Sequence, residues 1–361
     1  MNILFVHSIG RKKFGGGEKW LISAASGLRD NGHRVFVGAR PDSRLMKAAR
    51  HNNLETVAFN IFSDISIYHI FRIAFFLRKH KIDVLITKDR DLFVAGTAAR
   101  FGGRPLVLVR HGLPMRSSYK KHTFLLKNLA DGVITNTCSI KDLYEMNGWV
   151  KKDFTRVIYN GTIATNNIPS YSYSEKFPGR KIVLIVGRLA VQKGYFYLID
   201  AISLLVKKHK DLMFVVLGEG KLYRKLVAYA RKKGVSDHIH FEGFVDNVVP
   251  YLKGCDIFVL PSLYEGMSNA AMEAMSYGKP VILTNVNGAK ELIPDPRKGL
   301  LIPPRDAEAI AHAVELLKDD AELREELGRE AQKHVLANFP VSEMISKIQM
   351  YIEERIMAKN S

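Results

Sequence analysis

Two glutamates lie eight positions apart, Glu265 and Glu273, in the stretch Leu263-Tyr-Glu-Gly-Met-Ser-Asn-Ala-Ala-Met-Glu273. A strand-like apolar run precedes the stretch and a helical pattern follows it, so one carboxylate lies in a loop and the other lies within a helix. Gly266 lets the backbone pass close to a ligand. Peptide N–H groups at a helix start attract phosphate, and three residues offer them here: Met267, Ser268 and Asn269. The stretch therefore suits a ligand with hydroxyl groups at one end and phosphate in the middle.

Two cations follow another apolar run, Ile182–Val186, in the segment Gly187-Arg188-Leu-Ala-Val-Gln-Lys193-Gly194. Arginine offers a planar fork to phosphate oxygens, and lysine offers a mobile point charge. This combination suits a diphosphate leaving group. Taken alone, such a pair is also typical of ordinary surface charge. The prediction of a diphosphate site therefore depends on the nearby glutamates.

Two further motifs occur in the first half of the chain. Gly15-Gly16-Gly17-Glu18 follows the first predicted strand and precedes a helix, where it could approach a phosphate or a sugar. It is not a dinucleotide-binding fingerprint, because Trp20 occupies the place of the third glycine. His111 ends the apolar strand Leu106–Arg110 and precedes Gly112, although a lone histidine is often only a structural hydrogen-bonding group.

Short apolar runs alternate with longer helical patterns along the whole chain, which predicts doubly wound parallel sheets. The predicted strands of the first series are 3–7, 34–38, 83–87, 106–110, 132–135 and 155–158, with helices near 18–31, 66–80, 119–130 and 139–147. The second series is 181–186, 212–217, 238–241, 256–260, 280–284 and 299–302, followed by helices at 306–318, 320–338 and 341–357. We expect an N-terminal domain over 1–165, a linker over 166–179, a C-terminal domain over 180–340, and a last helix over 341–361 that crosses back to the first domain.

Composition agrees with two globular domains. The chain has 361 residues, 47% of them apolar, and no apolar run is long enough to span a membrane. The opening apolar run Met1–Val6 is too short for a signal peptide. Cys138 and Cys255 are far apart in the sequence, which favours reduced thiols in a cytosolic protein.

These motifs together resemble those of the family-4 retaining glycosyltransferases, which have the GT-B fold of two Rossmann-like domains facing across a cleft. The motifs that carry the resemblance are Gly187-Arg188 with Lys193-Gly194, Glu242-Gly243-Phe244, the Glu265/Glu273 pair, Ala274-Met-Ser-Tyr-Gly-Lys-Pro-Val281, Gly288-Ala-Lys-Glu291 and Gly299-Leu-Leu-Ile-Pro303. The resemblance runs from about residue 180 to about residue 340. In the first half it is limited to Gly15–Glu18, Arg110-His111-Gly112 and Tyr159-Asn160-Gly161.

The resemblance implies a role for each motif. Glu265 would accept hydrogen bonds from donor-sugar hydroxyls, Glu273 would hold the ribose, Arg188 and Lys193 would neutralise the diphosphate, and His111 would contact the donor sugar. The other implied donor-binding residues are Gly16, Gly17, Gly187, Glu242, Gly243, Phe244, Gly266, Met267, Ser268 and Asn269. The family transfers sugar with retention by front-face displacement and needs no metal or other cofactor, and no Asp-x-Asp metal motif is present in this chain.

Basic residues are concentrated in one half of the chain. Residues 1–178 contain 28 Lys and Arg against 13 Asp and Glu, a balance of +15, whereas the remainder has a balance of only +3. Cations alternate with apolar groups in the segments 68–81 and 115–127, as in helices that bind anionic membranes. The first segment could equally be an ordinary sheet-covering helix. In the second we expect Arg116, Lys120, Lys121 and Lys127 to contact a membrane or an acceptor, with an apolar contribution from Phe124–Leu126.

The sequence therefore predicts a cytosolic, peripherally membrane-bound glycosyltransferase that uses a nucleoside diphosphate sugar, UDP rather than GDP, and acts on a glycan or lipid-linked acceptor. Lipopolysaccharide, capsule and other cell-surface polysaccharides are the expected products. Two alternatives remain at this point. One is a sugar-nucleotide epimerase of the same fold, and the other is a basic nucleic-acid-binding protein, although no zinc-finger, RRM or KH signature is present.

Overall fold

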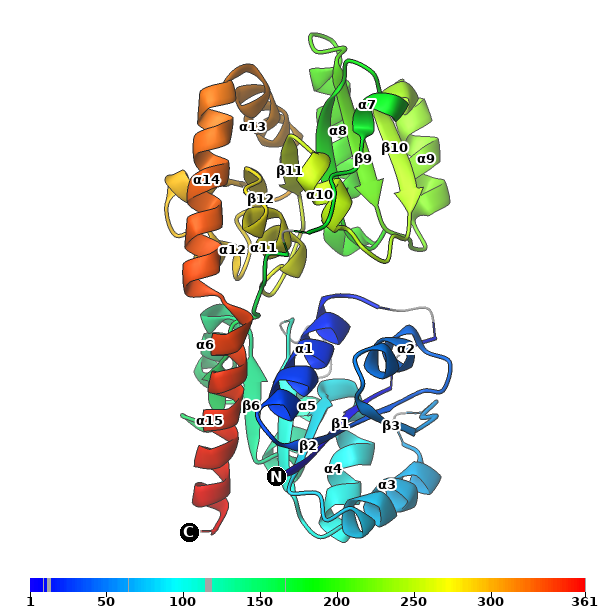
Figure 1. The fold of residues 1–361 in the computed structure, drawn as a ribbon, viewed down its shortest axis with the longest axis vertical. Coiled ribbons are helices and arrows are strands. Elements are labelled where there is room, and N and C mark those ends of the chain that lie inside the picture. Colours follow the sequence, from blue (N-terminus) through cyan, green and yellow to red (C-terminus); the bar gives the residue numbers. More distant parts are fainter. Residues whose placement is uncertain (9, 12–13, 64, 114–118, 166, 361) are drawn as a thin grey trace. The chain divides into compact units, whose positions relative to one another are not determined.

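The computed structural model describes residues 1–8, 10–11, 14–63, 65–113, 119–165 and 167–360. The chain forms two compact domains (Figure 1). The first domain comprises Met1–Gly161 together with Val341–Ser361, and the second comprises Thr162–Pro340. The chain thus returns to the first domain for its last helix.

The first domain contains a seven-stranded parallel sheet of order β3-β2-β1-β4-β5-β6-β7. Its strands are β1 (Asn2–His7), β2 (Arg34–Ala39), β3 (Glu55–Ala58), β4 (Val84–Lys88), β5 (Leu106–His111), β6 (Gly132–Thr135) and β7 (Thr155–Val157). Its helices are α1 (Gly16–Asp30), α2 (Arg44–His51), α3 (Ile67–Lys79), η1 (Asp89–Asp91), α4 (Leu92–Phe101), α5 (Tyr119–Leu129), α6 (Cys138–Met146) and α15 (Val341–Asn360).

Both faces of this sheet are covered, because successive side chains of a strand point to opposite sides. Ile3 and Phe5 of β1 pack into a core with α1, α2 and α15. Leu4 and Val6 pack into a second core with α3, α4, α5 and α6. The contact of α1 with α15 is close, since a Cβ at Gly27 would lie 2.0 Å from Ile345 Cδ1.

The second domain contains a six-stranded parallel sheet of order β10-β9-β8-β11-β12-β13. Its strands are β8 (Lys181–Val186), β9 (Leu212–Leu217), β10 (Ile239–Gly243), β11 (Ile257–Leu260), β12 (Val281–Thr284) and β13 (Leu300–Ile302). Its helices are α7 (Tyr173–Lys176), η2 (Val191–Lys193), α8 (Tyr195–Leu205), α9 (Tyr223–Lys232), η3 (Ser236–His238), α10 (Val249–Gly254), α11 (Asn269–Ser276), α12 (Ala289–Leu292), η4 (Pro296–Lys298), α13 (Ala307–Asp319) and α14 (Ala321–Asn338).

The predicted fold class, two doubly wound parallel-sheet domains, is confirmed. Helices α2 and α4 and strand β3 are not predicted from the sequence. Strand β3 has only four residues and an exposed Glu55, so it lacks the apolar run that marks the other strands. The segment predicted as a linker is partly folded onto the second domain, where Tyr173 is buried and the Tyr171 ring stacks on Tyr251 with centroids 4.3 Å apart.

Candidate functional site

The loop after β8 carries the predicted cations and lies against the end of β11. Gly194, between η2 and α8, has a φ of +67°, which favours glycine. A Cβ at this position would lie 1.9 Å from the carbonyl oxygen of Pro261, the residue that follows β11. Glycine therefore allows two loops at the carboxyl edge of the sheet to meet, where ligands of open parallel sheets bind.

Lys193 and Glu265 meet in this place. The Lys193 Nζ forms an ion pair with Glu265 Oε1, and Ser262 Oγ donates a hydrogen bond of 2.9 Å to the same oxygen. Both charged side chains are largely shielded, with 14% and 13% of their surface exposed. Two residues predicted to bind different parts of one ligand are thus directly paired with each other.

Gln192 connects the two loops and was not found by sequence reasoning. Its side-chain Nε2 donates to the backbone carbonyl of Tyr264 at 3.0 Å, and its backbone carbonyl accepts from Leu263 N at 2.7 Å. Arg188 Nη2 donates to Gln192 Oε1 at 3.4 Å. Gln192 therefore places Arg188 next to the Lys193–Glu265 pair, a role that nothing in its sequence context indicates.

Helix α11 begins at Asn269, with Ser268 as its N-cap. Ser268 Oγ accepts a hydrogen bond from Ala271 N at 3.3 Å. Gly266 and Met267 are buried at this helix start, and Glu273 is half-buried in the second turn. The first N–H groups of a helix have no partner within it, and here the Ser268 hydroxyl supplies one for Ala271 N.

The segment Glu242–Phe244 ends β10 and is joined to the rest of the edge through its backbone. Gly243 has a φ of +87°, and its carbonyl accepts from Gly218 N at 2.6 Å. The Glu242 carboxylate is already engaged by Lys176 Nζ and by His240 Nε2, each at 2.9 Å. Partial burial opposes ionisation, but Lys176 and His240 still hold the pKa of Glu242 below its ordinary value. The side chain of Glu242 is thus held by Lys176 and His240.

In the first domain, His111 lies at the end of β5 and is buried, with 3% of its surface exposed. Its Nδ1 is hydrogen-bonded to the Tyr144 hydroxyl, and the two rings meet edge to face. Nε2 of His111 is buried and has no hydrogen-bond partner among the residues that the structure describes. Burial lowers the pKa of His111, although Asp89 acts in the opposite direction. A neutral imidazole with one unoccupied nitrogen results.

The glycine-rich loop is fixed by a network of charged groups that the sequence analysis did not find. Glu18 Oε1 lies 2.7 Å from His7 Nε2 and 3.0 Å from Lys88 Nζ, and Glu18 Oε2 accepts from Gly15 N at 2.8 Å. Asp91 accepts from Ser8 N at 2.9 Å. Lys88 also lies close to Gly17, since a Cβ at Gly17 would come within 2.5 Å of Lys88 Nζ and would displace the end of this side chain. Gly16, the other predicted binding glycine, is the first residue of α1.

A second cation lies beside this network. The Arg110 guanidinium is buried, donates to Asn160 Oδ1 at 2.9 Å and lies 4.3 Å from the centre of the Trp20 ring. Burial lowers the pKa of Arg110 to about 10, and the charge of Glu18 opposes that decrease. Glu18 keeps its negative charge, because His7 and Lys88 outweigh its burial and lower its pKa to about 2. His7, Lys88 and Arg110 come from the neighbouring strands β1, β4 and β5, and the sequence signal for them is that each lies at or next to the end of a buried strand.

Two family profiles together match nearly the whole chain. The profile described as "Glycosyltransferase Family 4" matches residues 14–164, and the profile described as "Glycosyl transferases group 1" matches residues 172–334. The chain belongs to the family-4 glycosyltransferases. Both the resemblance inferred from the motifs and the GT-B class are thereby confirmed.

Individual relatives are glycosyltransferases too, but the share of their length that aligns with this chain differs. Alpha-D-kanosaminyltransferase of Streptomyces kanamyceticus is 34% identical over 165 residues, which are 45% of this glycosyltransferase and only 43% of the relative. The UDP-Gal:alpha-D-GlcNAc-diphosphoundecaprenol alpha-1,3-galactosyltransferase of Escherichia coli is 28% identical over 304 residues, 77% of each chain. The structure of Anabaena Alr3699/HepE in complex with UDP-glucose has a TM-score of 0.86 at 21% identity and covers 98% of this chain and 100% of that one. That structure shows the fold alone.

Three of the four basic residues predicted to contact a membrane or acceptor lie on α5. Lys120, Lys121 and Lys127 are exposed, and Arg116 lies outside the described residues. The expectation for Phe124–Leu126 is largely wrong. Leu125 and Leu126 are buried in the core against the sheet, and only Phe124 is exposed. Helix α5 uses its apolar side for folding, so little of that side is available for a lipid surface.

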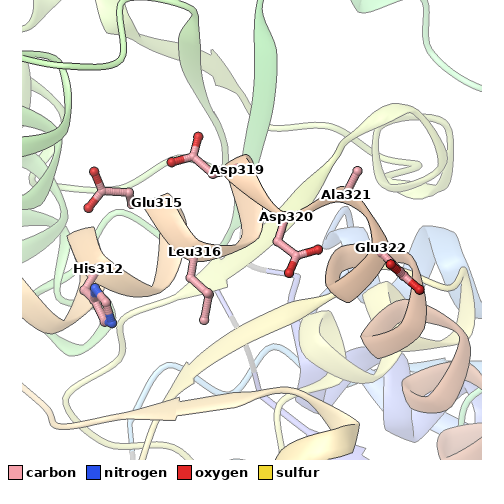
Figure 2. A pocket seen from close by; sticks show the side chains of 7 residues that line it. All are labelled: His312, Glu315, Leu316, Asp319, Asp320, Ala321 and Glu322. Atoms are coloured by element: carbon pink, nitrogen blue, oxygen red, sulfur yellow. The ribbon is translucent and has the colours of Figure 1, made fainter.

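Away from these residues, α13 borders a surface hollow of about 660 Å³ (Figure 2). Two residues that line it, Glu315 and Asp319, have potential metal-ligand atoms within 4.8 Å of each other and of His209, which is not part of the lining. However, Lys208 Nζ lies 3.6 Å from Glu315, and Lys318 Nζ lies 3.2 Å from Asp319. Because these ammonium groups already neutralise the carboxylates, we assign no metal to this cluster.

In the part of the chain that the structure describes, no helix has both the length and the apolar character that crossing a bilayer requires.

Proposed function

We propose that this glycosyltransferase transfers a sugar from a nucleoside diphosphate sugar, UDP rather than GDP, to a glycan or lipid-linked acceptor, with retention of configuration and without a metal. The observation that carries the proposal is the Lys193–Glu265 pair, with Arg188 beside it, at the carboxyl edge of the second sheet. The names of relatives support the choice of substrates. One of them acts on a UDP sugar and a diphosphoundecaprenol-linked acceptor, and another was solved with UDP-glucose.

The ion pair suggests how the site changes when the donor binds. A diphosphate near Arg188 would compete for the Lys193 ammonium, since phosphate carries more charge than the Glu265 carboxylate. Release of Lys193 would leave Glu265 able to accept hydrogen bonds from sugar hydroxyls. Binding of the two parts of the donor would thus be coupled through one exchange of partners.

The transfer step requires only the two substrates and these side chains. The acceptor oxygen forms a bond to the anomeric carbon as the bond from that carbon to the diphosphate breaks on the same face. The acceptor proton passes to a phosphate oxygen of the leaving group, so the products are a glycoside and a nucleoside diphosphate. Arg188 and Lys193 stabilise the negative charge that develops on the diphosphate.

The remaining parts of the proposal concern acceptor and location. We assign the acceptor to the first domain, whose positive charge suits a phosphate-containing acceptor, with Arg116, Lys120, Lys121 and Lys127 contributing. The enzyme would work in the cytoplasm at the inner face of the membrane, in synthesis of lipopolysaccharide, capsule or another cell-surface polysaccharide. A thermal-shift screen of nucleotide sugars tests the donor, because a bound ligand raises the stability of the native state. Consumption of a stabilising donor with no acceptor-linked product would instead indicate an epimerase.

Glu273→Ala should raise the donor KM more than it lowers kcat. The proposed hydrogen bonds to ribose exist in both the ground state and the transition state, and their loss costs about 1.5–3 kcal/mol. Initial rates at varied donor concentration measure both constants. Glu326→Ala, which removes an exposed glutamate from α14, is the control. An unchanged donor KM in folded Glu273→Ala would refute the ribose contact.

His111→Ala should strongly reduce transfer while sparing the affinity for the bare nucleoside diphosphate. The proposed contact of His111 is with the sugar, which the bare nucleotide lacks. Calorimetric titration with the nucleoside diphosphate and with the intact donor separates the two affinities. His51→Ala, at the exposed end of α2, controls for loss of an imidazole in the same domain. Equal weakening of both ligands would place His111 in the nucleotide pocket or in the structural core.

A further inference from the structure

Helix α3 exposes an unusual surface. Its outward positions include four large apolar side chains that are each between 65% and 69% exposed: Ile67, Tyr68, Phe71 and Phe75. A helix on the surface of a globular domain normally places polar groups at such positions. Contiguous exposed apolar groups on a folded domain commonly mark an interaction surface.

The fold does not use this side of α3. The opposite side supplies the core contacts, through the buried residues Ile70, Ile73, Ala74 and Leu77. Replacing an outward residue therefore removes little from the core. Helix α5 differs in this respect, because Leu125 and Leu126 are both buried.

The polar groups on the same side of α3 are all cationic. Arg72, Arg78 and Lys79 are exposed, and the helix contains neither aspartate nor glutamate. The Arg72 guanidinium carbon lies 5.6 Å from the centre of the Tyr68 ring, which keeps this cation beside the aromatic group. Phe62, which precedes α3 in the chain, is 63% exposed, and its ring centre lies 4.6 Å from the guanidinium carbon of Arg40.

We propose that this α3 outer face, formed by Ile67, Tyr68, Phe71, Arg72, Phe75 and Arg78, docks on an anionic lipid surface. The inference deepens the proposed function, because a lipid-linked acceptor would be reached at such a surface. Aromatic rings bury in the boundary between headgroups and acyl chains, while arginine and lysine extend toward lipid phosphates. The positive charge of the first half of the chain, +15, is complementary to an anionic leaflet.

Charge also decides against a second copy of this chain as the occupant. Two such faces would bring Arg72 and Arg78 of each copy together with no acid on α3 to compensate. Like-charge contacts of this kind oppose association. An acidic protein partner is the remaining alternative, and the test below separates it from lipid.

The test is co-sedimentation of the full chain with phosphatidylcholine vesicles that either contain or lack phosphatidylglycerol, at low and at physiological salt. We expect binding only with phosphatidylglycerol, and weaker binding at the higher salt, since screening shortens the reach of the cations. Phe71→Gln with Phe75→Gln should reduce the bound fraction at both salt concentrations, because salt does not screen the apolar contribution. Arg78→Glu with Lys79→Glu should lower the vesicle affinity about 30-fold or more at low salt.

Two matched controls keep the outcome specific to α3. Arg231→Glu with Lys232→Glu makes the same change of charge in the last turn of α9, in the second domain. Met357→Gln removes another exposed apolar side chain, on α15. Both should bind vesicles as the unaltered chain does. If the controls lose as much binding as the α3 variants, only overall charge matters and the proposal is overturned.

Other results would also overturn it. The proposal fails if the unaltered chain ignores phosphatidylglycerol vesicles at low salt, which would leave an acidic protein as the partner of this face. A dimer in light scattering that disappears in Phe71→Gln with Phe75→Gln would assign the face to a second copy. Calorimetric titration of the same variants with the nucleoside diphosphate keeps this test separate from the proposed function. Lost vesicle binding with intact nucleotide affinity concerns α3 alone, whereas vesicle binding by a chain that transfers no sugar would refute only the proposed reaction.

Discussion

Arg188→Ala and Lys193→Ala should each lower kcat by about 10²-fold or more, with a smaller change in donor KM. Both cations are placed to meet the diphosphate, whose negative charge increases as the glycosidic bond breaks. Their interactions are therefore stronger in the transition state than in the ground state. Steady-state rates and single-turnover rates with the donor identified by the nucleotide-sugar screen measure the effect.

Lys181→Ala is a suitable control for the lysine. Lys181 lies at the other end of β8 and pairs with Asp256 at 3.3 Å. Its loss should leave kcat nearly unchanged. Near wild-type turnover in both Arg188→Ala and Lys193→Ala would contradict their assignment to the leaving group.

The Lys193–Glu265 pair adds a second way in which Lys193→Ala could act. If Lys193 only holds Glu265 in place, then Glu265→Gln and Lys193→Ala should each cause the same loss, and the double variant should lose no more. If Lys193 binds the diphosphate, the double variant should lose more activity than either single variant. This cycle separates a positioning role from direct stabilisation of the leaving group.

The sequence predicts the strands of both domains apart from β3, because buried parallel strands are near-continuous apolar runs and β3 is not one. It also predicts which residues follow those strands, and hence Arg188, Lys193 and Glu265 as members of one site. What it does not show is that Lys193 pairs with Glu265. That contact depends on β8 and β11 being neighbours in the sheet and on the close approach at Gly194, both of which are tertiary features.

The network around Glu18 was missed for the same reason. Lys88 and Asp91 are distant in sequence from His7 and Glu18, and each looks like an ordinary polar residue at or just after the end of a strand. Their strands become neighbours only in the order β1-β4-β5. The outer face of α3 could not be defined from the sequence. Apolar residues occur all around this helix, and the sequence alone does not tell which of them pack against the sheet.

Glu18→Gln should reduce the unfolding free energy of the first domain by about 3 kcal/mol at neutral pH. The carboxylate is held charged by His7 and Lys88, and its pKa falls from 4.5 to about 2 on folding. Because the folded-state pKa is lowered, this stabilisation is fully present above pH 4.5 and disappears as the pH falls toward 2. The difference between the unaltered chain and Glu18→Gln should therefore shrink between about pH 5 and pH 2.

Denaturant unfolding followed by tryptophan fluorescence measures this difference. The chain has two tryptophans, Trp20 and Trp149, and both lie in the first domain, so the signal reports that domain. Glu55→Gln is the matched control. Its carboxylate pairs with Arg34 at 2.8 Å but is 49% exposed, so its loss should cost less than about 1 kcal/mol.

The result for Glu18→Gln also bears on the glycine-rich loop. Glu18 bonds to Gly15 N, while Lys88, held by Glu18, lies against Gly17, so the same carboxylate fixes both ends of the loop. If stability falls as expected, the buried charge of Glu18 holds this loop in a fixed conformation. If Glu18→Gln is as stable as Glu55→Gln, the network does not hold the loop, and Gly16 and Gly17 are held only as the first residues of α1.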